Sequence, residues 1–220
     1  CCRPPLRSAE LAAGPLRRVL AAPFKIVVGT AAADRRVEEM YFAAAIAFAN
    51  AWADTGGGVT SIVADSELEL AEVKGNLILL GGVRSNAISR ALASEQPFSS
   101  LFEIDAAPKK RIEGGFGIGG CDFRAAGVGL VSLGPVARGA GGLVATIAGT
   151  TAAGVDRAMH MFRSRLFEVN SWQHRLPDWI VVGPSDGKSG QGGELQGVMG
   201  AGYWGNHWEY RADASHLDCK

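Results

Sequence analysis

The sequence lacks a charge imbalance, a long hydrophobic run and a closely spaced pair of cysteines. Its 220 residues include 22 Lys and Arg against 22 Asp and Glu, so the formal net charge is zero. A neutral chain lacks the basic surface that binding to a phosphate backbone requires, which argues against a nucleic-acid partner. No apolar run approaches the ~20 residues of a membrane-spanning helix. With 47% hydrophobic residues, the chain instead has the composition of a globular protein that buries a core.

The four cysteines are Cys1, Cys2, Cys121 and Cys219, and none belongs to a C-x-x-C pair. This spacing argues against a zinc knuckle or a dithiol redox motif, and we expect neither a metal nor a cofactor. We expect free thiols, with a bridge from Cys1 or Cys2 to Cys219 as the alternative. Because residue 1 is Cys and no basic-then-apolar leader precedes it, the chain is predicted to be a processed or excised piece.

Glycine, by contrast, is abundant, with 30 residues in the chain, roughly twice the usual share. In the first half, short apolar runs that end in glycine turns alternate with helical patterns. Strands are predicted at residues 24–28, 59–63 and 76–80, and helices at 34–54 and 85–95. This alternation predicts an α/β fold with a three-layer, flavodoxin-like and mostly parallel sheet that is covered on both faces.

The second half has a different pattern. Residues 101–134 are rich in glycine and broken into the short runs 101–104, 115–118 and 128–133. These runs indicate short antiparallel strands or an antiparallel hairpin insertion. The alternation then resumes, with strands predicted at 143–148 and 178–182 and a helix at 152–163. We expect an N-terminal tail, a single α/β domain and a C-terminal tail, over residues 1–13, 14–210 and 211–220.

One loop contains the pattern of a serine nucleophile. Residues 183–187 read G-P-S-D-G, a literal G-x-S-x-G. In α/β-hydrolases this pattern places the serine on a sharp turn between strand and helix, and an acid and a histidine follow in the chain. Ser185, Asp213 and His216 would fill these roles. The glycine-rich segment after Ser185 does not predict the required helix, and Pro184 restricts the backbone, so a polar loop is the simpler interpretation.

Two segments are similar to phosphate-binding motifs, but one has the wrong spacing and the other the wrong structural context. Residues 183–189 are similar to a P-loop, but Gly183 and Gly187 are one residue too close. Residues 115–120 satisfy G-x-G-x-x-G, the dinucleotide fingerprint, which must leave a strand and enter a helix. The flanking residues predict neither element, so a glycine-rich hairpin is the better interpretation.

The glycine turns after the predicted strands could form a ligand site. The carboxyl ends of parallel strands meet at one edge of a sheet, where these turns would converge. The predicted ligand-binding residues are Gly29, Thr30, Gly81, Gly82, Gly149, Thr150 and Gly183. The same turns have a purely structural explanation, because connections between strand and helix often need glycine.

Tryptophan is concentrated near the C-terminus, at Trp172, Trp179, Trp204 and Trp208. Aromatic side chains at this density can line a carbohydrate-binding surface. Packing over the end of the sheet is the commoner use of such residues, and we expect packing.

Five groups of residues follow the order of a known family. They are 14–16 with 22–30 (GPL, APFKIVVGT), 76–82 with 85–87 (NLILLGG, SNA), 147–150 with 154–158 (IAGT, GVDRA), 177–183 (PDWIVVG) and 200–206 (GAGYWGN). This series, over residues 14–210, resembles the C-terminal region of large secreted proteins, many of them fungal, that are α/β-hydrolases of prolyl-oligopeptidase or esterase type. In those proteins a serine-hydrolase domain precedes a segment of this kind.

The resemblance implies a non-catalytic role. The family's nucleophile and histidine are expected in the preceding hydrolase domain, so no catalytic residue is carried over and the match at Ser185 would be a coincidence. The resemblance also implies secretion, with a hydrolase domain of the same parent polypeptide as the partner. Our leading hypothesis is an accessory C-terminal domain of a secreted serine hydrolase. The alternatives are a free-standing hydrolase that uses Ser185, and a flavodoxin-like module that binds a small ligand.

Overall fold

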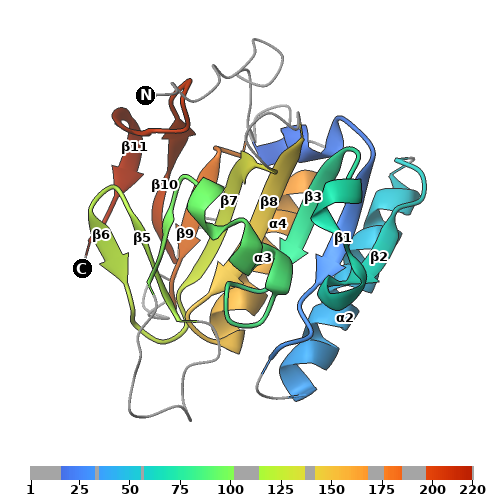
Figure 1. Cartoon of the computed structure of the whole chain (residues 1–220). Coiled ribbons are helices and arrows are strands. Elements are labelled where there is room, and N and C mark those ends of the chain that lie inside the picture. The colour runs from blue at the N-terminus through green and yellow to red at the C-terminus, as the bar shows by residue number, and fades with distance from the viewer. Residues whose placement is uncertain are drawn as a thin grey trace.

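The computed structural model describes residues 16–32, 35–55, 57–101, 114–136, 142–167, 176–184 and 197–219. These residues form two β-sheets and three α-helices (Figure 1). The larger sheet has eight strands in the order β11-β10-β9-β7-β8-β3-β1-β2, and the smaller sheet has the order β4-β5-β6.

The elements have the following bounds. The larger sheet comprises β1 (Phe24–Val28), β2 (Ser61–Ala64), β3 (Asn76–Leu80), β7 (Gly129–Pro135), β8 (Leu143–Gly149), β9 (Trp179–Val182), β10 (Val198–Trp204) and β11 (Tyr210–Leu217). The smaller sheet comprises β4 (Ser99–Leu101), β5 (Gly115–Ile118) and β6 (Cys121–Phe123). The helices are α2 (Arg35–Asp54), α3 (Ala87–Ala91) and α4 (Ala152–Phe167), with short 3-10 helices η1 (Leu16–Leu20), η2 (Asp65–Glu67), η3 (Leu70–Glu72) and η4 (Ala93–Glu95).

Most strands of the larger sheet run in one direction. Strands β2, β1, β3 and β8 lie side by side in parallel. Strand β7 pairs antiparallel with both β8 and β9, so β9 runs in the direction of β8. Strand β10 runs against β9 and β11. The sheet is therefore mixed, and the carboxyl ends of β1, β2, β3, β8 and β9 meet at one edge, which we call the carboxyl edge.

The helix predicted at 34–54 is confirmed as α2. Its buried residues Val37, Tyr41, Ala45 and Phe48 recur at three- and four-residue spacing, which places them on one helix face. That face packs on the sheet beside α4, where the rings of Phe48 and Phe162 stack with centroids 5.3 Å apart. The strands predicted at 24–28 and 76–80 are confirmed as β1 and β3, whereas the helix predicted at 85–95 is shortened to α3 followed by the 3-10 helix η4.

The two faces of the larger sheet have different covers (Figure 1). Helices α2 and α4 cover one face, where Ile26 and Val28 of β1 join their core. Helix α3 covers the opposite face near β1 and β3, and Val27 points into that second core. The smaller sheet packs on the same face as α3, against Leu130 of β7 and Trp179 of β9.

The assignment of residues 101–134 to an insertion is wrong in part. Residues 99–101 and 115–123 do form the small antiparallel sheet, whereas residues 102–113 lie outside the described residues. Strand β7, however, belongs to the larger sheet, between β8 and β9. Six of its seven residues are buried, as expected for a strand that is covered on both faces. Its glycines, Gly129 and Gly134, gave it the pattern of a hairpin.

The C-terminal segment is a strand where we expected a tail. Residues 211–217 lie in β11, which pairs antiparallel with β10 and forms one edge of the larger sheet. All of its side chains are exposed or half-buried, so the sequence carries little hydrophobic alternation to identify it. Charged side chains such as Arg211 and Asp213 are typical of an exposed edge strand, because they oppose pairing with another chain.

The expectation of free thiols is wrong for two of the four cysteines. Cys121 in β6 and Cys219 after β11 form a disulfide across 98 residues of sequence. Their spacing gave no indication of the pair, because only the packing of the small sheet against the β10–β11 hairpin brings the two residues together. In the same region Trp179 and Trp204 are buried with ring centroids 5.7 Å apart, which confirms packing for these two tryptophans.

Candidate functional site

The carboxyl edge is held together by a buried aspartate. Asp65 begins η2 directly after β2 and is 4% exposed. Its Oδ1 accepts hydrogen bonds from the amide and the hydroxyl of Thr30, at 3.0 and 2.6 Å. Its Oδ2 accepts one from the amide of Ala87, at 2.6 Å. The carboxylate thus joins the ends of β1 and β2 to the start of α3.

A buried asparagine completes this connection. The Oδ1 of Asn86 accepts from the amides of Ile88 and Ser89, at 2.9 and 3.0 Å, which makes it the N-cap of α3. Its Nδ2 donates to the carbonyl oxygens of Val27 and Leu80, at 3.3 and 3.0 Å. One side chain therefore satisfies groups of β1, β3 and α3 together.

Thr150 has the corresponding role at the end of β8. Its hydroxyl donates to the carbonyl oxygen of Ala125 at 2.7 Å and accepts from the amide of Val128 at 3.1 Å. The amide of Thr150 donates in turn to the carbonyl oxygen of Val128, at 2.8 Å. This residue is 1% exposed, so the three bonds fix the segment before β7 against the end of β8.

The structure brings the predicted ligand-binding turns together at this edge but uses several of their amides internally. The amides of Gly29, Gly81 and Gly183 donate to Leu80, Ile147 and Gly197, at 3.0, 3.0 and 2.6 Å. A Cβ on Gly29 would lie 2.4 Å from the carbonyl oxygen of Ser85. Glycine is needed there because two backbone segments approach closely. Because these amides donate to the chain's own backbone, they are not available as donors to a ligand. The turns therefore fit a structural role better than a ligand site.

The predicted hydrolase residues are not assembled among the described residues. Ser185 lies outside them, as does the P-loop-like segment beyond Pro184. The carboxylate of Asp213 accepts from the Nε and Nη2 of Arg211, with Nε at 2.9 Å from Oδ1. This hydrogen bond and the adjacent positive charge lower the pKa of Asp213. His216 lies opposite Ala201 on the exposed edge strand β11. Asp213 is therefore paired with an arginine in solvent, unlike the buried acid that orients a catalytic histidine.

The G-x-G-x-x-G match is a hairpin. Residues 115–118 form β5, residues 121–123 form β6, and Gly119 and Gly120 make the turn between them with φ of 59° and 86°. Positive φ at both central residues is the geometry of a tight two-residue hairpin. This confirms the structural interpretation of the motif.

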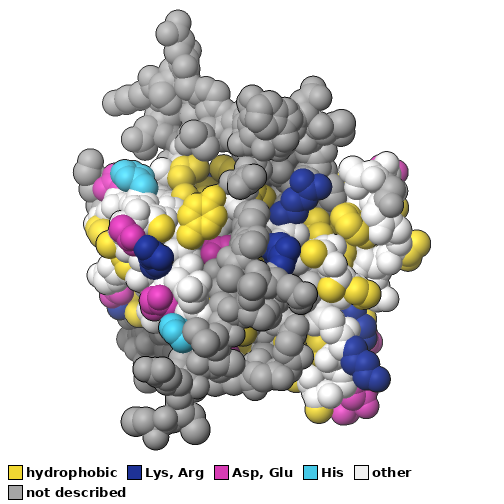
Figure 2. Space-filling view, turned by 90° about the horizontal axis from the view of Figure 1, so that it is seen from above, with side chains coloured by type: hydrophobic (Ala, Val, Ile, Leu, Met, Phe, Trp, Pro, Cys, Tyr) yellow, Lys and Arg dark blue, Asp and Glu magenta, His cyan; other side chains and the backbone are white. Residues whose placement is uncertain are grey.

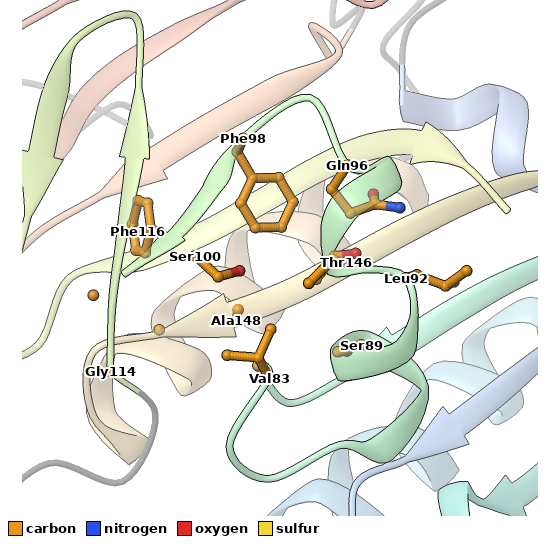
Figure 3. A pocket seen from close by; sticks show the side chains of 14 residues that line it. Val83, Ser89, Leu92, Gln96, Phe98, Ser100, Gly114, Phe116, Thr146 and Ala148 are labelled. Carbon is orange, nitrogen blue, oxygen red and sulfur yellow. The ribbon is translucent and has the colours of Figure 1, made fainter. Parts of the chain in front are cut away.

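A pocket that the sequence did not predict lies on the face of the sheet that carries α3 (Figure 3). Thr146 and Ala148 of β8 form its base, and Gly149 continues it toward the carboxyl edge. Residues of three other regions surround them, among them Val83 after β3, Leu92 after α3, and Phe98 before β4 with Phe116 in β5 of the small sheet. The volume of the cavity itself is about 20 Å³, which is room for little more than one water molecule. Gly82 and Gly149 are predicted ligand-binding residues that line it.

The polar groups of this pocket differ in how they are satisfied. The hydroxyl of Ser89 donates to the carbonyl oxygen of Gly81 at 2.8 Å, and Gln96 Nε2 donates to that of Pro135 at 3.1 Å. Thr146 is 2% exposed, yet its Oγ1 has no hydrogen-bond partner among the described residues. A buried hydroxyl without a partner is uncommon and costs stability. Sequence reasoning missed the site because its residues come from separate elements with no common spacing.

On the side seen in Figure 2, acidic and basic side chains of the described residues both occur among hydrophobic ones. No cluster of three potential metal ligands occurs among the described residues. Within the same ranges, no helix has the length and apolar character needed to cross a membrane. No protein-family model matches the chain, and no curated protein matches it.

Proposed function

We propose that this chain is a non-catalytic accessory domain of a secreted serine hydrolase, of prolyl-oligopeptidase or esterase type. In this proposal the chain has a three-layer, flavodoxin-like fold, made of the larger sheet and the helices on its two faces. The small antiparallel sheet is inserted into this fold. The ordered resemblance over residues 14–210 supports the family. The strand order β8-β3-β1-β2 supports the fold, because it is the order expected when crossovers lie on both sides of β1.

The observation that carries the proposal is the use of polar side chains at the carboxyl edge. Asp65, Asn86 and Thr150 each bind two or more groups of the chain's own backbone. In enzymes of this fold class, this edge is where polar groups are available for substrate. Here they fix the connections between elements, as expected of a scaffold that packs against a partner domain.

The disulfide supports secretion. Bridges such as Cys121–Cys219 form and persist in oxidising compartments and are rare in the cytosol. The same compartment is expected for the partner, which we propose to be a hydrolase domain of the same polypeptide.

A small-ligand-binding module has little support, because the pocket over Thr146 has room for little more than one water molecule. The free-standing hydrolase also has little support, since Asp213 is bound by Arg211.

Sequencing the natural transcript upstream of residue 1 tests the accessory role. We expect an in-frame serine-hydrolase domain, and we expect the complete polypeptide to lose hydrolase activity or stability when residues 1–220 are deleted. A transcript that encodes no hydrolase in frame would overturn the proposal. So would a complete polypeptide whose activity and thermal stability are unchanged by the deletion.

A further inference from the structure

We propose that the outer face of α2 is an interface for a second copy of this chain, with the two α2 helices antiparallel across a two-fold axis. The inference goes beyond the accessory role and does not depend on it. Helix α2 is the outermost helix of its layer, with α4 on one side and the edge strand β2 on the other (Figure 1). Its outer face is therefore at the end of the molecule, where a second copy can reach it.

The middle of α2 has an unusual composition for a surface helix. Residues 40–53 include no charged residue, although one face of the helix is in solvent. On that face Ala43, Asn50 and Ala53 are exposed, and Ile46 is 52% exposed. Surface helices usually carry charged side chains away from the core, and a helix that is apolar on all sides is usually buried. This composition fits a helix whose outer face is covered in the assembled protein.

Exposed hydrophobic side chains are concentrated at this end of the molecule. Among the described residues three large ones are exposed, and two of them are Ile46 on α2 and Val59 in the loop after it, whereas the third is Tyr203 on β10. Strand β2, which begins two residues after Val59, carries no charged side chain, while β11 at the opposite edge carries Arg211 and Asp213. Charged residues on an edge strand oppose pairing with another chain. The end with α2 and β2 lacks this protection.

The outer face of α2 is complementary to itself when its direction is reversed. In an antiparallel pair centred between residues 44 and 45, Ile46 of one copy faces Ala43 of the other, so a large side chain meets a small one. Asn50 faces Glu39, and its amide can donate to that carboxylate. A two-fold interface uses the same patch on both copies and requires such self-complementarity. The pattern therefore fits a second copy as the partner.

The charges at the ends of α2 favour the antiparallel orientation. Arg35 and Arg36 begin the helix and Asp54 ends it. Both signs are unfavourable for a single helix, because its N-terminus carries a partial positive charge and its C-terminus a partial negative one. The exposed ion pair of Arg35 with Glu39, at 3.2 Å, offsets little of this. In the antiparallel pair, both arginines lie beside Asp54 of the second copy, whereas a parallel pair would bring arginine against arginine.

Sedimentation equilibrium of the complete chain over a range of concentrations tests the inference. One helix pair is smaller than a standard interface, so we expect a weak dimer that dissociates at micromolar concentrations. Ile46→Lys places two like charges close together at the two-fold axis and should weaken the dimer by about tenfold or more. The matched control is Tyr203→Lys, because Tyr203 is a large hydrophobic residue, 40% exposed, on β10 and far from α2 in the sheet order. It should leave the dimer unchanged.

Exchange of the end charges tests the orientation. Asp54→Arg faces the two arginines of the second copy and should weaken the dimer by about two- to fivefold, the value of an exposed ion pair. The double variant Arg35→Asp with Asp54→Arg should recover most of that loss. A chain that stays monomeric at about 1 mM overturns the inference. So does a dimer that Ile46→Lys and Tyr203→Lys weaken equally, or one that the double variant weakens further than Asp54→Arg alone.

Discussion

Two threonines of similar burial, four residues apart, differ in what their hydroxyls do. Thr150 binds Ala125 and Val128 and so connects two segments of the fold. Thr146 has no partner for its Oγ1 among the described residues. The contrast separates a side chain that stabilises the fold from one that costs stability and lines a pocket.

Replacing each threonine by valine should therefore have opposite effects. Thr146→Val removes an unsatisfied buried hydroxyl and should raise the free energy of unfolding by about 0.5–2 kcal/mol. Thr150→Val leaves the amide of Val128 and the carbonyl of Ala125 without this partner and should lower it by about 1–3 kcal/mol. Urea denaturation of both variants measures the difference. A loss of stability in Thr146→Val equal to that in Thr150→Val would contradict the assignment.

The ion pair on β11 makes a prediction about pH. The hydrogen bond from Arg211 lowers the pKa of Asp213 in the folded chain. Because the folded pKa lies below the unfolded one, the pair's contribution is present above the unfolded pKa and is lost as the pH falls through the folded pKa. Carboxyl-carbon NMR titration should give Asp213 a pKa below its usual 3.8. Arg211→Gln should raise it, and an unchanged pKa would show that the pair does not form in solution.

At the scale of elements, the close approach of α4 to β7 depends on a glycine inside a helix. A Cβ on Gly154 would lie 2.2 Å from the carbonyl oxygen of Val128, and a Cβ on Gly129 would lie 2.1 Å from that of Gly154. Both obstacles are backbone atoms, so no side chain can move aside. The helix and the strand can pack at this distance only without side chains between them.

Gly154→Ala should accordingly destabilise the fold, although alanine is the better helix former by about 1 kcal/mol. We expect a loss of about 2 kcal/mol or more, because α4 must move away from β7. The exposed neighbour Ala153 provides the control, since Ala153→Gly should cost only the intrinsic ~1 kcal/mol. Thermal unfolding of the two variants gives the comparison. A gain in stability for Gly154→Ala would refute the close-packing explanation.

The elements differed in how well their sequences predicted them. The face of α2 that contains Tyr41 and Phe48 has the period of a helix, and the run at 24–28 has the composition of a buried strand, so both were predicted correctly. Residues 128–133 were predicted as a short antiparallel strand but were placed in the insertion, because the pairing of β7 with β8 and β9 leaves no signal along the sequence. Strand β11 was missed because it lies at an exposed edge and needs no apolar face.

At the scale of the whole molecule, the features that matter most connect residues far apart in sequence. The pocket combines Val83, Phe116 and Thr146, which come from the turn after β3, from β5 and from β8. The disulfide joins residues separated by 98 positions. Sequence periodicity reports on neighbours along one element, so it predicted the glycine turns at the carboxyl edge but neither of these long-range features.

The disulfide should be a major source of stability. Closing a loop of this length restricts the unfolded chain, and removing the bridge with Cys121→Ser and Cys219→Ser should lower the free energy of unfolding by about 2–5 kcal/mol. The control is the double variant Cys1→Ser with Cys2→Ser, which should leave stability unchanged. If that control destabilises the chain as much and frees a thiol at Cys219, the bridge to the N-terminus is the correct one.

The central claim is that this chain is a scaffold without catalytic activity of its own. Intact-mass spectrometry of the purified 220-residue chain after incubation with a fluorophosphonate serine probe tests it most directly. We predict no change in mass. A single adduct that is absent from Ser185→Ala but present in the matched Ser189→Ala variant would contradict the account and identify a serine hydrolase.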